Sequence, residues 1–289
     1  MILTIFGWHN NTVEIDSRLN ITMHLQRKMY GKMYHIFNNA ICNNILMMNQ
    51  KTMDVTYDFS KKVVLITGGT GALGRMLVKK FIDSGAITIS SFHSEKEAQK
   101  LKIENPEVEL IKMDLLREEQ LLKTISQLVQ QFGTINILVN VVGGYLGGKN
   151  INDLNETEWD AMLNLNLKSA FLISKHVIPV MKSGNGGNIV HVSSRTGQKS
   201  EGGDSAYAAS KAGLIRFVES AAQEFKEDKI NVNCILPTTI DTDANRKAMP
   251  NADFTKWAST EDLANVILFL CSSGARVING SAIPTYGLS

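Results

Sequence analysis

The sequence is poor in cysteine and in net charge, and it has no long apolar run. Its three cysteines, Cys42, Cys234 and Cys271, lie far apart and form no CxxC pair, so neither a disulfide framework nor a zinc site is predicted. The formal net charge of +2 gives no strong field that would favour nucleic acid or a membrane surface as a partner. No run of about 18 apolar residues occurs, so no transmembrane helix is predicted. We therefore expect a cytoplasmic globular protein with reduced thiols and no nucleic-acid or membrane partner.

Two patterns of reactive sites are also missing. No GxSxG motif is present, which argues against a hydrolase triad of that type. The histidines show no metal-ligand spacing, so we expect no metal site; they include His9, His24, His35, His176 and His191. His191 falls inside the apolar pattern of a strand, and we interpret it as a packed core side chain with satisfied hydrogen bonds.

The first 52 residues differ in composition from the rest of the chain. They contain 8 asparagines and 6 of the 12 methionines, and no Asp or Glu occurs between Ser17 and Thr52. We interpret residues 1–52 as a poorly ordered extension or as the product of an upstream start site, with Met53 as the functional start. An acid-poor targeting segment and a small docking element are the alternatives. Residues 53–289 are expected to form the main domain.

A glycine-rich stretch follows a predicted strand near the start of this domain. Val63–Thr67 is an apolar run, which is typical of a strand buried on both faces. Gly68–Gly74 comes next and contains a GxGxxG pattern, and residues 75–82 have helical spacing. Strand, glycine turn and helix are the context of a dinucleotide-binding fingerprint, with a simple tight turn as the alternative. Glycine allows close approach to a pyrophosphate, and the helix N-terminus offers it free N–H groups.

Strand and helix patterns then alternate to the end of the chain. Further strands are predicted at 87–91, 108–113, 135–140, 188–193, 230–236 and 281–284. Helices are predicted at 95–104, 118–131, 156–181, 205–226 and 261–271. These repeated units predict an α/β fold with a single Rossmann-type, doubly wound parallel sheet and helices on both faces.

Polar and small residues gather at the predicted carboxyl ends of these strands. Asp114, Asn140–Gly144, the serine pair at 193–194 and the segment 237–242 each follow a strand directly. Ligands of doubly wound sheets bind outside the carboxyl ends of the strands. The strand ends therefore predict a ligand site without reference to any motif.

Tyr207 and Lys211 lie four residues apart in a predicted helix. This spacing stacks both side chains on one helix face, although many ordinary helices carry the same pair by chance. A free phenol has a pKa of about 10, and we expect the neighbouring ammonium to lower the pKa of Tyr207 toward the working range. The pair is therefore a candidate for proton transfer.

From about residue 59 to residue 287, the motifs resemble those of the short-chain dehydrogenase/reductase family. Thr67–Gly74 is similar to the family's TGxxxGxG, with Ala72 where the middle glycine usually stands. Asp114 resembles the acidic residue near the adenine, Asn140–Gly144 resembles NNAG, and Pro237–Thr242 resembles the loop that closes over the nicotinamide. The resemblance implies cofactor binding by Gly68, Gly69, Thr70, Gly71, Ala72, Leu73, Gly74, His93, Ser94, Asp114, Leu115, Asn140, Val142, Gly143, Tyr207, Lys211, Pro237, Thr238, Ile240 and Thr242.

The same resemblance implies four catalytic residues. Tyr207 and Lys211 match YxxxK, and Ser194, the second of two adjacent serines, lies 13 residues before Tyr207, as is usual in the family. Asn166 matches the catalytic asparagine, with Asn164 as its rival. These matches imply hydride transfer between a nicotinamide and a carbonyl or alcohol, with Tyr207 as general acid or base. Ser194 would stabilise charge on the substrate oxygen, Lys211 would bind the ribose, and Asn166 would hold a water.

The residues after the second strand bear on the choice of nicotinamide. An acidic residue at this strand end binds the ribose 2′-hydroxyl and repels a 2′-phosphate. Here the segment offers Ser91, His93, Ser94 and Lys96, and the strand end itself has no Asp or Glu. The pattern is similar to that of NADP-preferring members, so we expect NADP(H) to be favoured over NAD(H).

The resemblance leaves the substrate open. A small carbonyl or alcohol compound comes first, and a 3-oxoacyl-[acyl-carrier-protein] thioester comes second. Residues 143–148 and 236–257 resemble quinonoid dihydropteridine reductase, which makes a pteridine the third alternative. A nucleotide-binding regulator without turnover is an alternative of a different class. In the family, two helices form the interface between subunits, so the resemblance implies a homodimer or homotetramer.

Overall fold

The computed structural model describes residues 12–14, 22–24 and 56–288. The chain divides into two units, residues 1–55 and residues 56–289, and each is described by itself. In the first unit, β1 (Thr12–Glu14) pairs antiparallel with β2 (Thr22–His24). The rest of the segment 1–52, including Cys42, lies outside the described residues, and our interpretation of this segment stays a prediction.

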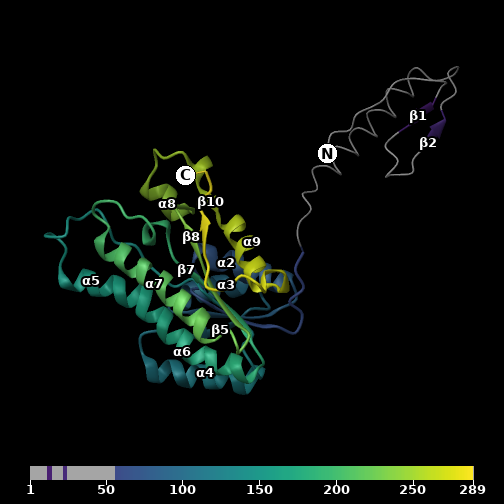
Figure 1. Cartoon of the computed structure of the whole chain (residues 1–289), viewed down its shortest axis with the longest axis horizontal. Helices are drawn as coiled ribbons and strands as arrows, with labels where there is room; N and C mark the ends of the chain where they lie inside the picture. The colour runs from purple at the N-terminus through teal and green to yellow at the C-terminus, as the bar shows by residue number, and fades with distance from the viewer. Residues whose placement is uncertain (1–11, 15–21, 25–55, 289) are drawn as a thin grey trace. The chain divides into compact units, whose positions relative to one another are not determined.

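The second unit contains a seven-stranded parallel sheet (Figure 1). Its strands are β3 (Val63–Thr67), β4 (Ile87–Phe92), β5 (Glu109–Lys112), β6 (Ile137–Asn140), β7 (Gly187–Val192), β8 (Ile230–Pro237) and β11 (Ala282–Thr285). They lie in the order β11-β8-β7-β6-β3-β4-β5, and every neighbouring pair is parallel. The predicted doubly wound parallel sheet is confirmed.

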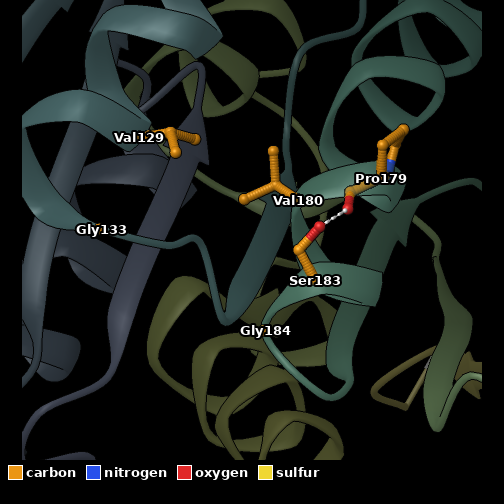
Figure 2. Close-up of a pocket in the computed structure, with 6 residues that line it drawn as sticks. All are labelled: Val129, Gly133, Pro179, Val180, Ser183 and Gly184. Atoms are coloured by element: carbon orange, nitrogen blue, oxygen red, sulfur yellow. Dashed lines mark hydrogen bonds between the residues drawn. The ribbon is translucent and has the colours of Figure 1, made fainter.

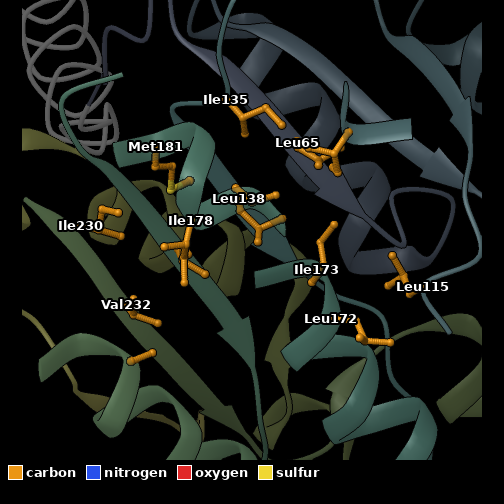
Figure 3. Packing of buried hydrophobic residues seen from close by; sticks show 14 of the residues in the cluster. Leu65, Leu115, Ile135, Leu138, Leu172, Ile173, Ile178, Met181, Ile230 and Val232 are labelled. Atoms are coloured by element: carbon orange, nitrogen blue, oxygen red, sulfur yellow. The ribbon is translucent and has the colours of Figure 1, made fainter. Parts of the chain in front are cut away.

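Helices cover both faces of the sheet (Figure 1). They are α2 (Ala72–Asp83), α3 (Glu95–Glu104), α4 (Glu118–Phe132), α5 (Glu156–Leu163), α6 (Ser169–Ser183), α7 (Ser205–Glu224), α8 (Asp243–Ala248) and α9 (Thr260–Cys271). Apolar side chains of α4, α6 and α7 pack on one face, and those of α2, α3 and α9 pack on the other. Figure 3 shows part of the first layer, where Ile173, Ile178 and Met181 of α6 lie near Leu138 of β6. This two-sided burial explains the continuous apolar runs of the central strands.

The strand order reverses between β3 and β6, and this position organises the candidate site. From β3 the chain moves outward through β4 and β5, and it then returns to the other side of β3 with β6. The loops that leave the carboxyl ends of β3 and β6 therefore turn to opposite faces of the sheet. Such a switch point opens a crevice in which doubly wound proteins bind their ligands.

The α-helices differ from the sequence-based prediction in two regions. The single helix expected at 156–181 is divided into α5 and α6 by a π-helical turn, Asn164–Lys168, in which the Ser169 N–H bonds the Asn164 carbonyl. One extra residue in a turn leaves the helical periodicity on either side almost unchanged, so the pattern could not reveal it. Helix α8 was also missed, because none of its six residues is buried and it therefore has no apolar stripe.

Candidate active site

The glycine loop connects β3 to α2 by a tight turn. Gly68 has a φ of 74°, and its carbonyl accepts a hydrogen bond from the Gly71 N–H at 3.1 Å. A Cβ on Gly74 would lie 2.2 Å from the Gly68 oxygen, so only glycine lets α2 begin this close to the loop. No acidic residue lies in the first turn of α2, and its N-terminal N–H groups carry positive potential. These features fit a pyrophosphate, as the fingerprint predicts.

Ala72 does not disturb this loop. It is the first residue of α2, it is exposed, and its φ is not positive. The N-cap position is taken by Gly71, which has an extended conformation with a φ of −76°. The backbone at residue 72 therefore has no need of the glycine that is usual in the family.

A cavity of about 220 Å³ opens beside the glycine loop at the switch point. Its lining combines residues at or just after the carboxyl ends of β3, β4, β5 and β6 with two residues of the helical segment after α5. They are Gly68, Thr70, Ser91, Phe92, His93, Met113, Asp114, Leu115, Leu116, Val142, Leu165 and Ser169. Six predicted cofactor residues lie in this list, from Gly68 and Thr70 to His93, Asp114, Leu115 and Val142, and the cavity has the setting expected for the adenosine part of a dinucleotide.

Two serines at the end of β4 have structural partners. Ser91 Oγ accepts a hydrogen bond from the Gly68 N–H at 3.2 Å, which ties the glycine loop to β4. Ser94 was predicted to contact the cofactor, but it is the N-cap of α3, where its Oγ accepts from the Glu97 N–H at 3.4 Å. Ser94 is not among the residues that line the cavity. His93 is therefore the predicted cofactor residue of this segment that lines the cavity.

A second cavity, of about 300 Å³, lies away from these residues (Figure 2). Val129 and Gly133 line it from α4 and its end, and Pro179, Val180 and Gly184 line it from α6 and its end. The Ser183 hydroxyl donates to the Pro179 carbonyl at 3.1 Å. Because Gly133 and Gly184 precede β6 and β7, this cavity lies at the amino ends of the strands. It contains no group suited to hydride or proton transfer.

The end of β7 and the start of α7 bring the predicted catalytic side chains together. Tyr207 and Ser194 interact through their hydroxyl groups, and Ser194 is 7% exposed. Lys211 is 4% exposed, and its Nζ donates to the Val192 carbonyl at 2.8 Å. The neighbouring Ser193 donates to the Lys211 carbonyl at 2.9 Å and so anchors α7 to β7. Of the two adjacent serines, the structure thus brings Ser194 to Tyr207.

Asn166 lies in the π-helical turn and is fully buried. Its Oδ1 accepts from the Gly144 N–H at 2.9 Å, and its Nδ2 donates to the Gly144 carbonyl at 3.1 Å and to Ser210 Oγ at 3.0 Å. The side chain therefore joins the loop after β6 to α7. The expectation that this residue holds a water stays a prediction. Its rival Asn164 is only half-buried.

The electrostatics of the pair differ from the prediction. Burial raises the pKa of Tyr207, the hydrogen bond with Ser194 lowers it to a smaller extent, and the Asp204 carboxylate raises it further. Burial lowers the pKa of Lys211 to about 8, and Cys234 opposes this slightly. The expectation that Lys211 lowers the pKa of Tyr207 was wrong. The ammonium lies 5.8 Å from the ring centre and donates to a backbone carbonyl, so desolvation dominates.

Sequence reasoning missed a contact between two loops above Tyr207. The rings of Tyr145 and Tyr207 form a T-shaped pair, with 5.0 Å between the ring centres and 84° between their planes. The Tyr145 hydroxyl donates to Asp204 Oδ1 at 2.9 Å. Asp204 is the N-cap of α7 and lies 59 residues from Tyr145. The glycine-rich flanks of Tyr145 were a visible signal of a special loop, but its partner could not be read from the sequence.

The predicted residues after β8 contact a different part of the chain. Thr238 Oγ1 donates to the Tyr286 carbonyl at 3.0 Å, Ile240 pairs with Ala258 of β10 (Ala258–Ser259), and Thr242 caps α8. Ile240 itself belongs to the short strand β9 (Ile240–Asp241), and Pro237 ends β8. All of them lie at the carboxyl end of β8, but none lines the cavity at the switch point.

Buried polar side chains are linked to one another by hydrogen bonds beneath the site. The Thr67 hydroxyl donates to Asn140 Oδ1, and Asn140 Nδ2 lies 3.2 Å from His191 Nδ1. On the other side of the ring, His191 Nε2 lies 3.2 Å from Ser174 Oγ. Burial lowers the pKa of His191 to about 3, with a smaller contribution from the charge of Lys211. His191 is thus a neutral core side chain with satisfied hydrogen bonds, as predicted.

Other predicted features can be compared with the described residues. Cys234 and Cys271 are buried free thiols, as expected for two of the three cysteines. Within residues 12–14, 22–24 and 56–288, no helix is long and apolar enough to cross a bilayer. Over the same residues, no group of three or more His, Cys, Asp or Glu side chains is arranged to hold a metal ion.

The fold and these side chains define an α/β protein with a dinucleotide site next to a Ser, Tyr and Lys constellation. A sequence profile of the short chain dehydrogenase family matches residues 62–253. The chain belongs to this family. It is therefore an NAD(P)-dependent oxidoreductase that acts on a carbonyl or alcohol substrate, as predicted.

Individual relatives differ in their substrates. The 3-oxoacyl-[acyl-carrier-protein] reductase FabG of Thermotoga maritima is 31% identical over 77% of this chain and 95% of its own length. The 7alpha-hydroxysteroid dehydrogenase of Bacteroides fragilis is 30% identical over 79% of this chain and 94% of its own. A short-chain type dehydrogenase/reductase from Mycobacterium ulcerans has the same fold, with a TM-score of 0.76 at 21% identity over 80% of this chain and 90% of that chain.

Proposed function

We propose that the chain reduces a carbonyl group, or oxidises the corresponding alcohol, with Tyr207 as the proton donor or acceptor. The observation that carries this proposal is the meeting of the Ser194 and Tyr207 hydroxyls at the carboxyl end of β7. Burial raises the pKa of Tyr207, which keeps the phenol protonated at neutral pH. A protonated phenol is the state that a general acid requires for carbonyl reduction.

The residues of the chain then have separate tasks. A bound nicotinamide supplies the hydride, and the protein supplies orientation and the proton. Tyr207 donates its proton to the substrate oxygen as negative charge grows there, and Ser194 donates a hydrogen bond to the same oxygen. Lys211 binds the ribose hydroxyls. Asn166 keeps the loop after β6 in register with α7 through its contacts with Gly144 and Ser210.

The test is the Tyr207→Phe variant, which retains the ring and removes the hydroxyl. We expect kcat for ketone reduction to fall by about 10²–10⁴, the usual value of a general acid, while dinucleotide binding stays within about twofold. The matched control is Tyr57→Phe, because Tyr57 packs beside Phe59, far along the chain from the site. A Tyr207→Phe variant that keeps more than about a tenth of wild-type kcat would contradict the proposal. Turnover in the wild type also excludes a nucleotide-binding regulator.

For the cofactor, we propose a preference for NADP(H). The support is the segment after β4, where His93 lines the cavity and Asp or Glu does not occur from Ile87 to Ser94. An imidazole accommodates a 2′-phosphate, whereas a carboxylate repels it. We expect kcat/KM for NADPH to exceed that for NADH by about tenfold or more, and His93→Asp to reverse this ratio. A wild-type preference for NADH would refute the assignment.

For the substrate, we propose a small carbonyl or alcohol compound, with a 3-oxoacyl thioester as the second candidate. The reductase of Thermotoga maritima supports the second candidate by its name, whereas the steroid dehydrogenase and the NAD-dependent glycerol dehydrogenase of Listeria innocua support the first. The pteridine alternative rests on two loops alone. A panel of simple ketones, 3-oxoacyl thioesters and quinonoid pterins at fixed NADPH separates the three by kcat/KM.

Three further proposals concern the whole chain. We propose a homodimer or homotetramer, which light scattering of the purified protein would distinguish from a monomer. We also propose that residues 53–289 form the catalytic domain, so a chain that starts at Met53 should retain the full kcat/KM. A cytoplasmic location stays a prediction, and cell fractionation tests it.

A further inference from the structure

An aromatic side chain beside the proton donor is exposed and yet held in place. Tyr145 is 66% exposed, although its ring contacts Tyr207 and its hydroxyl is bonded to Asp204. Exposure of a large aromatic ring forgoes the stability that its burial would give, and exposed aromatic surface at a site is typical of binding. The hydroxyl bond fixes the tip of the ring, so the exposed surface of the ring remains available beside Tyr207.

The loop that carries Tyr145 is held at both ends. Before it, Gly144 is bonded through both its N–H and its carbonyl to Asn166. After it, Lys149 forms an ion pair with Glu158, and the Lys149 N–H bonds the Gly203 carbonyl at 3.4 Å. These bonds reach α5 and the segment before α7, so the position of Tyr145 is set by the framework of the site.

The close approach of this loop depends on a missing side chain. A Cβ on Gly147 would lie 2.2 Å from the Tyr145 hydroxyl and 2.2 Å from Asp204 Oδ1. Any other residue at 147 would therefore separate Tyr145 from Asp204. On the opposite side, the Asp204 carbonyl accepts the Ala208 N–H at 2.7 Å, so Asp204 moves with the helix that carries Tyr207.

We propose that Tyr145 forms the substrate-binding wall beside the proton donor and selects substrates with a flat, conjugated ring next to the reacting carbonyl. This inference rests on the proposed function, in which the carbonyl oxygen binds at Tyr207 and Ser194. The centre of the Tyr145 ring is 5.0 Å from that of Tyr207, a spacing at which aromatic rings attract each other. A ring attached to the carbonyl carbon can pack on the exposed surface of the Tyr145 ring, and a saturated ring of the same size gains less there.

The test compares acetophenone with cyclohexyl methyl ketone, which have similar shapes but differ in aromaticity. We expect Tyr145→Ala to lower kcat/KM for acetophenone about threefold to tenfold more than for cyclohexyl methyl ketone, mainly through KM. Tyr145→Phe keeps the ring and loses the bond to Asp204, so it should retain the wild-type preference within about twofold. The control is Ile151→Ala, because Ile151 is a 75% exposed apolar side chain of the same loop.

Binding of the two ketones, measured by calorimetry on the dinucleotide-loaded Tyr207→Phe protein with and without Tyr145→Ala, separates two kinds of failure. If the wild type reduces neither ketone but binding of acetophenone depends on Tyr145, the proposed reaction fails and the aromatic wall stands. If Tyr145→Ala weakens both ketones equally in binding and turnover, Tyr145 acts only by positioning Tyr207, and the inference is overturned.

Discussion

The two sides of the switch point are built in different ways. On the nucleotide side, the turn of the glycine loop owes its shape to a close backbone approach that a missing side chain allows at Gly74. On the catalytic side, the shape depends on side-chain hydrogen bonds between residues that lie 22, 44 and 59 positions apart, namely Asn166 with Gly144, Asn166 with Ser210, and Tyr145 with Asp204. The contacts that shape the glycine loop join residues that are close in sequence, whereas those of the catalytic side join residues that are far apart. The two sides should therefore respond differently to substitution.

On the nucleotide side, the largest effect is expected at Gly74, where a single methyl group tests the glycine loop. The Cβ of Gly74→Ala would lie 2.2 Å from the Gly68 oxygen, which forces α2 away from the loop. Overpacking of this kind costs about 1–3 kcal/mol, so we expect dinucleotide binding to weaken by about 10–100-fold in a fluorescence titration. Gly274→Ala is the control, because its Cβ would be 3.4 Å from the nearest atom and Gly274 follows α9, outside the glycine loop. Equal affinities of the two variants would show that close packing does not shape this loop.

This contrast explains which parts could be predicted from the sequence. The glycine loop, the strands around it and the spacing of Tyr207 and Lys211 are local patterns, so the sequence predicted them almost to the residue. The direction of the Tyr207 pKa shift could not be predicted, because it depends on burial and on Asp204, which arrive only with the tertiary structure. The same holds for the hydrogen bonds of Asn166, since a helical pattern does not show which distant groups a buried amide meets.

On the catalytic side, a comparable effect is expected at Asn166. Asn166→Ala removes three hydrogen bonds, two to the half-buried backbone of Gly144 and one to the buried hydroxyl of Ser210. An unsatisfied buried group costs about 1–3 kcal/mol, so we expect a fall of about 10–100-fold in kcat/KM with dinucleotide affinity nearly unchanged. Asn164→Ala is the matched control from the same turn, and we expect a change below about twofold. If both variants lose activity equally, the π-helical turn matters as a whole and the amide of Asn166 does not.

The buried, hydrogen-bonded side chains around His191, beneath the site, predict a dependence of stability on pH. His191 has a pKa of about 3 in the folded protein and about 6.5 when unfolded. Below pH 6.5 the unfolded chain binds a proton that the folded chain does not, so stability falls as pH falls from 6.5 toward 3. The slope from this residue is about 1.4 kcal/mol per pH unit. Urea unfolding at pH 6.5 and pH 4.5 should show about 2–3 kcal/mol less pH-dependent loss in His191→Gln than in the wild type.

His176→Gln serves as the control for that measurement. His176 of α6 bonds the Glu118 carboxylate of α4 and has no part in the hydrogen bonds of His191. The control leaves those buried groups intact, so it should retain the pH-dependent loss that comes from His191. If His191→Gln also retains the pH-dependent loss of stability, the imidazole of His191 is protonated within the folded protein. The hydrogen bonds that join Thr67, Asn140, His191 and Ser174 then rearrange below pH 6.5.

The smallest effect is expected from Ala72→Gly, which restores the residue that is usual in the family. Because Ala72 is exposed at the first position of α2 with an ordinary φ, the substitution relieves no backbone strain. It removes one methyl group and lowers helix propensity by up to about 1 kcal/mol, so we expect dinucleotide affinity to change by less than about threefold. A fluorescence titration of this variant and of Gly74→Ala compares the dinucleotide affinities of two substitutions in the same loop. If Ala72→Gly tightens binding by more than about tenfold, the methyl group of Ala72 obstructs the pyrophosphate, and the loop is less well suited to its ligand than its backbone suggests.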